Sequence, residues 1–171
     1  FHMPLFFVLS GVFLRQGGSI GEVVKNRFDA IFKPYLFVAC SFGLAKLAFD
    51  MATSRGEAST WIRYFAGIAY GTGATLDTVP LWFLPHLFAA SIATVLVLRT
   101  AQASHLRWAC VIVGLGAGIF IMRLFESPRG EGNWPWLFDP RHDGLPWSLD
   151  LLPLTTSMLL AGHLLRRDLL T

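Results

Sequence analysis

Cysteine is rare in this sequence, and the short motifs of soluble enzymes are missing. Cys40 and Cys110 both fall inside apolar blocks, where we expect small buried residues and no disulfide or metal framework. The segment 17–21 matches the Gly-x-Ser-x-Gly pattern, but no strand precedes it, as a nucleophile elbow requires. There is no cluster of metal ligands, so no metal site is predicted. The glycine-rich segment 17–21 is not a phosphate loop, because no strand precedes it and the Lys-Ser/Thr ending is absent.

The charge pattern excludes a further class of partner. The net charge is only +3, and no basic stripe with interleaved aromatic residues is present, so we expect no nucleic acid to bind.

The first apolar block has neither a basic n-region nor a small-residue cleavage site, which excludes a signal peptide. Internal repeats, heptad runs and low-complexity tracts are also absent.

Apolar residues, in contrast, are abundant, and they make up 54% of the sequence against about 45–50% in ordinary soluble domains. They gather into blocks separated by charged, Gly- and Pro-containing stretches. A helix that crosses a bilayer needs roughly 20 residues, sometimes about 17. The blocks that approach this length are residues 1–14, 34–49, 81–98, 108–125 and 149–165. A weaker amphipathic stretch at 61–70 is expected to lie at the membrane interface.

We therefore predict an all-α fold, a polytopic transmembrane helix bundle with about five spans. Because the chain opens with Phe1 inside one apolar run and stops at Thr171 after another, we interpret residues 1–171 as one partial domain of a larger protein. Connections with a net positive charge alternate with connections in which acidic residues outnumber basic ones, in line with the positive-inside rule. The cytoplasmic segments are then 15–33, 99–107 and the end of the last block, and the periplasmic loops are 50–80 and 126–148.

Small residues mark the expected contacts between helices. Gly114-x-x-x-Gly118 is a close-approach pattern in the fourth block. In the third block, one helical face carries His86, Ala90 and Ala93 and is expected to turn inward. A second set of positions in that block is expected to meet lipid, namely Leu84, Phe88, Ile92 and Val95.

Ionisable groups at membrane depth are costly, so they are candidates for function by default. The candidate catalytic residues are His2, His86 and Asp150. Their alternative roles are an interfacial histidine bonded to a loop, a structural histidine bonded across helices, and a helix-start carboxylate favoured by the macrodipole. Arg27 and Lys33 can bind the phosphates of a cytosolic donor, or they can serve as a topology signal that binds lipid headgroups.

Four different segments carry a resemblance to a known family. In order along the chain they are FHMPLFFVLSG at 1–11, KNR at 25–27 followed by KPYL at 33–36, LWFLPHLF at 81–88, and LAGHLLRR at 160–167. Together these segments resemble the membrane-bound acyltransferase 3 family, which includes sugar O-acetyltransferases and fucose 4-O-acetylase-like proteins. The first segment looks like the second transmembrane helix of that family. The segment 81–88 is similar to its Leu-Trp-Phe-Leu-Pro-x-Leu-Phe signature.

The resemblance implies a bundle of about ten helices that moves an acyl group, usually acetyl, from cytosolic acyl-CoA to a hydroxyl. The protein is then an O-acyltransferase of the bacterial inner membrane. Its expected partners are the lipid bilayer, acetyl-CoA or another acyl-CoA as donor, and an envelope carbohydrate as acceptor, with no bound cofactor. A histidine in the first helix of the family is the expected catalytic base, and we expect that helix to precede Phe1.

In this interpretation Arg27 and Lys33 face the cytosolic donor. His2, His86 and Trp82 lie toward the periplasmic acceptor, and Trp82 is a candidate for substrate binding. Two other functions stay open, namely a secondary transporter or flippase component without acyl transfer and a non-catalytic membrane scaffold. Transporters also carry histidines at the membrane midplane, but they often contain internal repeats, and none is visible in this sequence.

Overall fold

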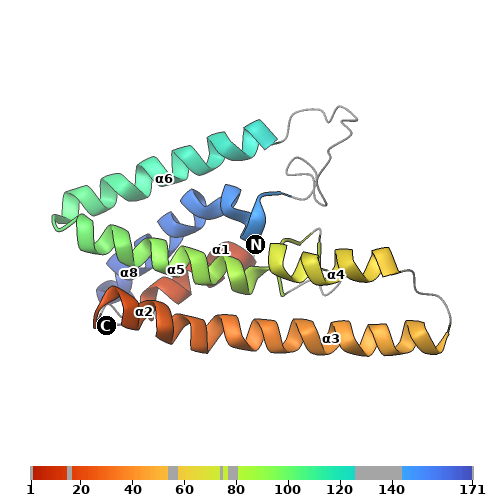
Figure 1. The fold of residues 1–171 in the computed structure, drawn as a ribbon. Helices are drawn as coiled ribbons and strands as arrows, with labels where there is room; N and C mark the ends of the chain where they lie inside the picture. The colour runs from red at the N-terminus through yellow and green to blue at the C-terminus, as the bar shows by residue number, and fades with distance from the viewer. Residues whose placement is uncertain are drawn as a thin grey trace. The chain divides into compact units, whose positions relative to one another are not determined.

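The computed structural model is all-helical in the part of the chain that it describes (Figure 1). The described residues are 2–14, 17–53, 58–73, 75–76, 81–125 and 144–170, without the side chains of residues 2, 58–60, 125 and 167–170. The helices are, in order, α1 (His2–Val12), α2 (Ile20–Arg27), the π-helical η1 (Phe28–Phe32), α3 (Lys33–Ala52), α4 (Ala58–Tyr70), α5 (Phe83–Thr100), α6 (Ser104–Phe125), the 3-10 helix η2 (Pro146–Leu151) and α8 (Leu152–Leu170). Most of the predicted loop at 126–148 lies outside the described residues.

Helix length and apolarity confirm the predicted membrane bundle. The described helices that are long and apolar enough to cross a membrane are Ile20–Ala52, Phe83–Thr100, Ser104–Leu124 and Pro146–Arg166. The first predicted block instead forms α1, an apolar helix of 11 residues. The amphipathic stretch predicted at the interface is α4. The chain is therefore a multi-pass membrane protein.

The predicted connection between the first two blocks is largely helical, which corrects the sequence-based segmentation. One helix of 33 residues runs through α2, η1 and α3, so Arg27 and Lys33 lie on helical turns. It begins with a capping box, in which the Ser19 amide donates to Glu22 Oε2 (2.8 Å) and the Glu22 amide donates to Ser19 Oγ (3.2 Å). The wide turn of η1 ends at Phe32, two residues before Pro34, whose ring and missing N–H disturb the regular helical bonds of the preceding turn.

The chain divides into two compact units. The first unit comprises Phe1–Arg27, Leu87–Ser127 and Asp150–Thr171, and the second comprises Phe28–His86 and Pro128–Leu149. The core of the first unit is a cluster of buried aliphatic side chains, namely Leu14, Val23, Val95, Leu98, Val111 and Leu160. These residues come from α2, α5, α6 and α8 and from a position shortly after α1, so the core joins several helices of this unit.

Helices α1 and α8 of the first unit approach each other at two glycines. A Cβ at Gly11 would collide with the backbone of Leu159, and a Cβ at Gly162 would collide with the backbone of Val8. Each helix thus presents its glycine to the backbone of the other. This reciprocal arrangement brings the two helices close enough for backbone–backbone contact, as small residues do between membrane helices.

The predicted close-approach pattern of α6 is confirmed, and its partner is α8. A side chain at Gly114 would meet Ser157 and the carbonyl oxygen of Pro153, and one at Gly118 would meet Leu154. Gly116, between them, faces open space. The two glycines that are four residues apart therefore pack against one partner helix, whereas the glycine between them does not.

The basic connections of the first unit gather at one end of it. The ends of α1, α5 and α8 and the starts of α2 and α6 lie there (Figure 1). Arg99 Nη2 donates to the carbonyl oxygen of Gly18 at 2.6 Å, which ties the end of α5 to the start of α2. Arg107 Nε donates to the carbonyl oxygen of Ala101 at 2.7 Å across the turn between α5 and α6. The connection that precedes α2 and the turn between α5 and α6, which were both predicted to be cytoplasmic, are therefore neighbours.

The second unit is built around the packing of α3 against α4. Its buried core consists of Tyr35, Ala39, Tyr64, Ile68 and Leu76. The hydroxyl of Tyr35 donates to the carbonyl oxygen of Ile68 at 2.5 Å, so the largest buried side chain of this core also has its polar group satisfied.

The predicted faces of α5 are partly wrong. His86 and Ala90 of the predicted inward face are fully buried, and Ala93, the third residue of that face, is half-buried. Phe88 and Val95, which were expected to meet lipid, are also buried, at 8% and 2% exposure. Val95 belongs to the core of the first unit. Periodicity shows which residues share a helical face, but it does not show how many faces of a helix are covered.

Candidate functional site

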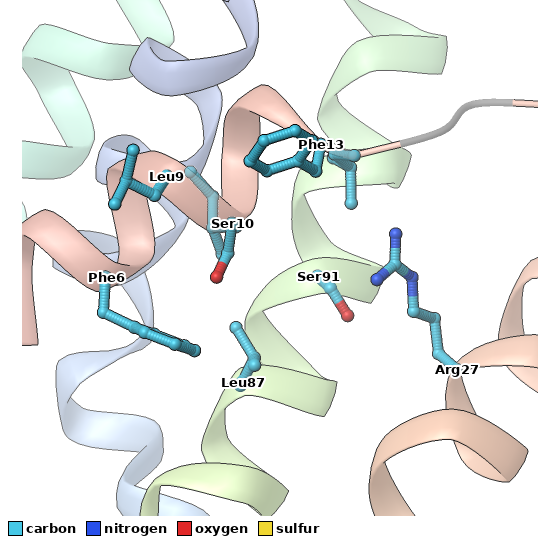
Figure 2. A pocket seen from close by; sticks show the side chains of 9 residues that line it. Phe6, Leu9, Ser10, Phe13, Arg27, Leu87 and Ser91 are labelled. Atoms are coloured by element: carbon cyan, nitrogen blue, oxygen red, sulfur yellow. The ribbon is translucent and has the colours of Figure 1, made fainter.

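The first unit contains a pocket of about 360 Å³, a size within the roughly 300–1,000 Å³ range of ligand sites. Side chains from α1, α2, α5 and α8 line it (Figure 2). Most of the lining is apolar, and the polar side chains are Ser10, Ser91 and Arg27. The apolar ones are Phe6, Leu9, Phe13, Leu14, Leu87 and Leu159. An apolar cavity with a few convergent polar groups is the usual form of a small-molecule site.

Helical spacing explains how α1 faces this pocket. Phe6, Leu9, Ser10 and Phe13 are separated by three or four residues, so they project on one side of α1 and the residue that follows it. Several of them are partly exposed, with Leu9 at 47% and Phe6 at 42% exposure. The pocket is therefore an open cavity into which a ligand can enter.

Two serine hydroxyls face the pocket from different helices. Ser91 Oγ donates to the carbonyl oxygen of Phe88 at 2.9 Å, so its lone pairs are available to accept a hydrogen bond. The side chains of Ser10, Ser91 and Arg27 surround the same space in Figure 2. These side chains combine hydrogen-bond donors and acceptors at one part of an otherwise apolar cavity.

Arg27, the last residue of α2, supplies the charge of the pocket. Its position is set by the capping box that starts α2 and by the bond from Arg99 to Gly18 just before it. A guanidinium presents five N–H donors and can bind phosphate or carboxylate oxygens in a bidentate manner. The predicted donor-binding role of Arg27 is therefore compatible with its location, because it lines a cavity.

Lys33, the other predicted donor-binding residue, lies in the second unit and has a local partner. Its Nζ is 2.6 Å from Asp29 Oδ1, four residues earlier on the helix. The two side chains are 62% and 43% exposed, so the pair contributes little to stability. The role of Lys33 in donor binding stays a prediction.

His86 and Trp82 lie together in the second unit. Their ring centroids are 6.4 Å apart. Nδ1 of His86 lies 2.9 Å from the carbonyl oxygen of Trp147, and the imidazole is completely buried. Because a carbonyl oxygen can only accept, Nδ1 carries the proton of this hydrogen bond. This bond matches the structural alternative for His86, while its catalytic role and the substrate-binding role of Trp82 stay predictions.

Asp150 and His2 complete the set of predicted catalytic residues. Asp150 is half-buried in η2, two residues before α8 begins, where a carboxylate is favoured by the helix dipole. His2 is the first residue of α1, but its side chain lies outside the described part of the structure. The structure tests neither residue as a base.

Ser10 and Ser91 were not recognised as candidates from the sequence, and neither was the contact between Trp147 and His86. The two serines are weak signals in sequence, because a hydroxyl in a membrane helix often bonds to its own backbone. Their spacing offered a hint, since Ser10 follows Phe6 and Ser91 follows Leu87 by one helical turn. The contact of Trp147 with His86 could not be read from sequence, because it joins residues 61 positions apart.

A family model described as an acyltransferase domain, that of the acyltransferase 3 family, matches residues 1–170. The chain belongs to this family. The resemblance seen in the four sequence segments is thereby confirmed at the level of the family, and the match indicates an acyltransferase. No curated protein and no solved structure matches the chain. As an acyltransferase 3 member, the chain places its pocket among α1, α2, α5 and α8, and these helices carry the family-like segments 1–11, 25–27, 81–88 and 160–167 in whole or in part.

Proposed function

We propose that this chain is part of an O-acyltransferase of the bacterial inner membrane that moves an acyl group from acyl-CoA to a hydroxyl of an envelope carbohydrate. The observation that carries the proposal is the pocket of the first unit. It combines apolar walls, which suit an acyl chain, with Arg27, which suits the phosphates or the thioester oxygen of the donor. The family match supports acyl transfer as the reaction class.

The reaction breaks the thioester C–S bond of the donor and forms an ester C–O bond to the acceptor. A base must remove the proton of the attacking hydroxyl, and coenzyme A leaves with its sulfur reprotonated. The negative charge that develops on the carbonyl oxygen requires hydrogen-bond donors. Arg27 and Ser10 can supply them from the pocket. The family resemblance assigns the base to a histidine of the family's first helix, and His2, His86 and Asp150 are the candidates within this chain.

Binding of the two substrates from opposite sides is part of the proposal. The end of the first unit that carries Arg99 and Arg107 would face the cytosol, where acyl-CoA is made. Trp82 would contact the acceptor, because aromatic rings stack on sugars through their apolar faces. Lys33 would add positive charge for the donor phosphates beside its partner Asp29.

The test is acyl transfer in isolated membranes with and without the full-length protein. Membranes are given acetyl-CoA or hexanoyl-CoA that is radiolabelled in the acyl group, and alkali-labile label in carbohydrate is measured. Label that depends on the protein and is released by alkali supports O-acyl transfer. Protein-dependent movement of a carbohydrate without ester formation would instead support the transporter or flippase alternative and contradict the proposal.

A further inference from the structure

The pocket of the first unit has a polar layer and an apolar layer one helical turn apart. Ser10, Ser91 and Arg27 form the polar layer (Figure 2). Phe6 lies one turn before Ser10 on α1, and Leu87 lies one turn before Ser91 on α5. A ligand that fits both layers needs a polar group attached to an apolar extension.

The dimensions of the pocket exceed those of an acetyl group. A water molecule takes about 30 Å³ of the liquid, so a volume of about 360 Å³ holds far more than the three heavy atoms of acetyl. From Phe6 to Ser10, which belongs to the polar layer, the helix rises roughly 6 Å, at about 1.5 Å per residue. An extended chain advances roughly 1.2 Å per bond, since three backbone bonds span at most about 3.6 Å. The apolar length is therefore enough for several methylene groups.

From these layers and dimensions we infer that the pocket binds the acyl chain of the donor and that this acyl chain has about four to six carbon atoms. The inference rests on the proposed acyl transfer and names the class of its donor. The thioester lies at the polar layer, where Arg27 complements the negative charge of the donor and Ser10 can donate to the carbonyl oxygen. The methylene groups lie against Phe6, Leu9 and Leu87, and the bond chemistry is that of the proposed transfer.

Donor preference tests the inference in membranes that contain the full-length protein. Acetyl-CoA, hexanoyl-CoA and dodecanoyl-CoA are compared by release of free coenzyme A and by transfer of the labelled acyl group. We expect kcat/KM for hexanoyl-CoA to exceed that for acetyl-CoA at least tenfold, because each additional methylene in an apolar pocket is worth roughly tenfold or more. Dodecanoyl-CoA should be a poorer donor than hexanoyl-CoA, because its chain exceeds the pocket.

Substitutions of residues that line the pocket test where the acyl chain binds. Leu9→Trp fills the pocket from α1 and should lower kcat/KM for hexanoyl-CoA at least tenfold, with acetyl-CoA affected less than threefold. Leu87→Phe does the same from α5 and provides a second variant should the first fail to reach the membrane. Leu5→Trp is the matched control, since Leu5 is 58% exposed on the same helix and does not line the pocket.

Each outcome decides a different claim. Equal or better use of acetyl-CoA would overturn the chain-length inference but leave acyl transfer standing. A preference for hexanoyl-CoA that neither pocket variant changes would show that the acyl chain binds outside this pocket, which also overturns the inference. No release of coenzyme A from any donor, with the protein present at normal levels, would overturn the proposed acyl transfer itself.

Discussion

The Nδ1 atom of His86 lies 2.9 Å from the carbonyl oxygen of Trp147, and this bond joins the start of α5 to the turn that precedes α8. The turn has an unusual backbone, in which Trp147 and Ser148 adopt φ values of 56° and 53°. Left-handed conformations cost L-residues roughly 1–2 kcal/mol each. Further contacts of Trp147 offset that cost, because its Nε1 donates to the carbonyl oxygen of Ala69 at 2.9 Å and its ring packs on Phe32.

Substitution of His86 separates a structural role from a catalytic one. We expect His86→Leu to lower the free energy of unfolding by about 1–3 kcal/mol, because the buried carbonyl of Trp147 loses its donor. His86→Asn should retain most of the stability, since the amide N–H can replace the Nδ1–H. Thermal unfolding of the full-length protein in detergent measures both changes.

The same Asn variant tests His86 as a catalytic base. Loss of a general base lowers the rate by roughly 10²–10⁴-fold. A folded His86→Asn protein that transfers acyl groups at the wild-type rate would contradict the catalytic prediction and leave His86 with the structural role alone.

Ser148 provides a test of the left-handed turn. Ser148→Gly and Ser148→Ala both remove the hydroxyl, but only glycine adopts φ near 53° without strain. We expect the glycine variant to be more stable than the alanine variant by about 1 kcal/mol. Equal unfolding temperatures for the two variants would show that the turn relaxes at little cost.

The packing of α6 on α8 predicts opposite results at two nearby glycines. Gly118→Ala should destabilise the protein by about 1–3 kcal/mol, because the added methyl would overlap the backbone of Leu154. Gly116→Ala should be neutral or stabilising by up to about 1 kcal/mol, because nothing lies within reach of the methyl and alanine favours the helix. Thermal unfolding in detergent distinguishes them, and equal losses would argue against this helix pair.

Arg27 is expected to act in donor binding. Arg27→Ala should raise the apparent KM for acyl-CoA about tenfold, because a charged hydrogen bond is worth roughly 1.5–3 kcal/mol. Arg27→Lys should restore part of the affinity, since it keeps the charge but not the planar donor geometry. Lys25→Ala is the control, as Lys25 is exposed on the same helix and does not line the pocket. An unchanged donor requirement in Arg27→Ala would rule out this role.

The alternation of basic connections predicts the orientation of the chain in the membrane. In a background with Cys40 and Cys110 replaced by serine, single cysteines are placed at Gln102, in the turn between α5 and α6, and at Thr53, after α3. Both positions are exposed. A membrane-impermeant maleimide added to intact cells should label Thr53→Cys at once and Gln102→Cys only after lysis. The reverse pattern would show that the orientation is inverted.

Properties of single segments were predictable from the sequence. Hydropathy and length indicated the membrane helices, and the spacing of Gly114 and Gly118 indicated a close helix contact that the structure assigns to α8. Predictions that needed the neighbours of a helix were less successful. Phe88 and Val95 were expected to meet lipid, yet both are buried. Arg27 was recognised as a candidate, but the serines beside it in the pocket were not.

The sequence by itself determined that this protein is a bundle of membrane helices of the acyltransferase 3 type, because apolar length and local motifs are carried within each segment. Only the tertiary structure decided that Ser10, Ser91 and Arg27 line one pocket and that Trp147 bonds to His86. The physical reason is that the rotation and closeness of helices depend on packing between distant segments. At Gly11 and Gly162 that packing depends on the absence of a single Cβ atom.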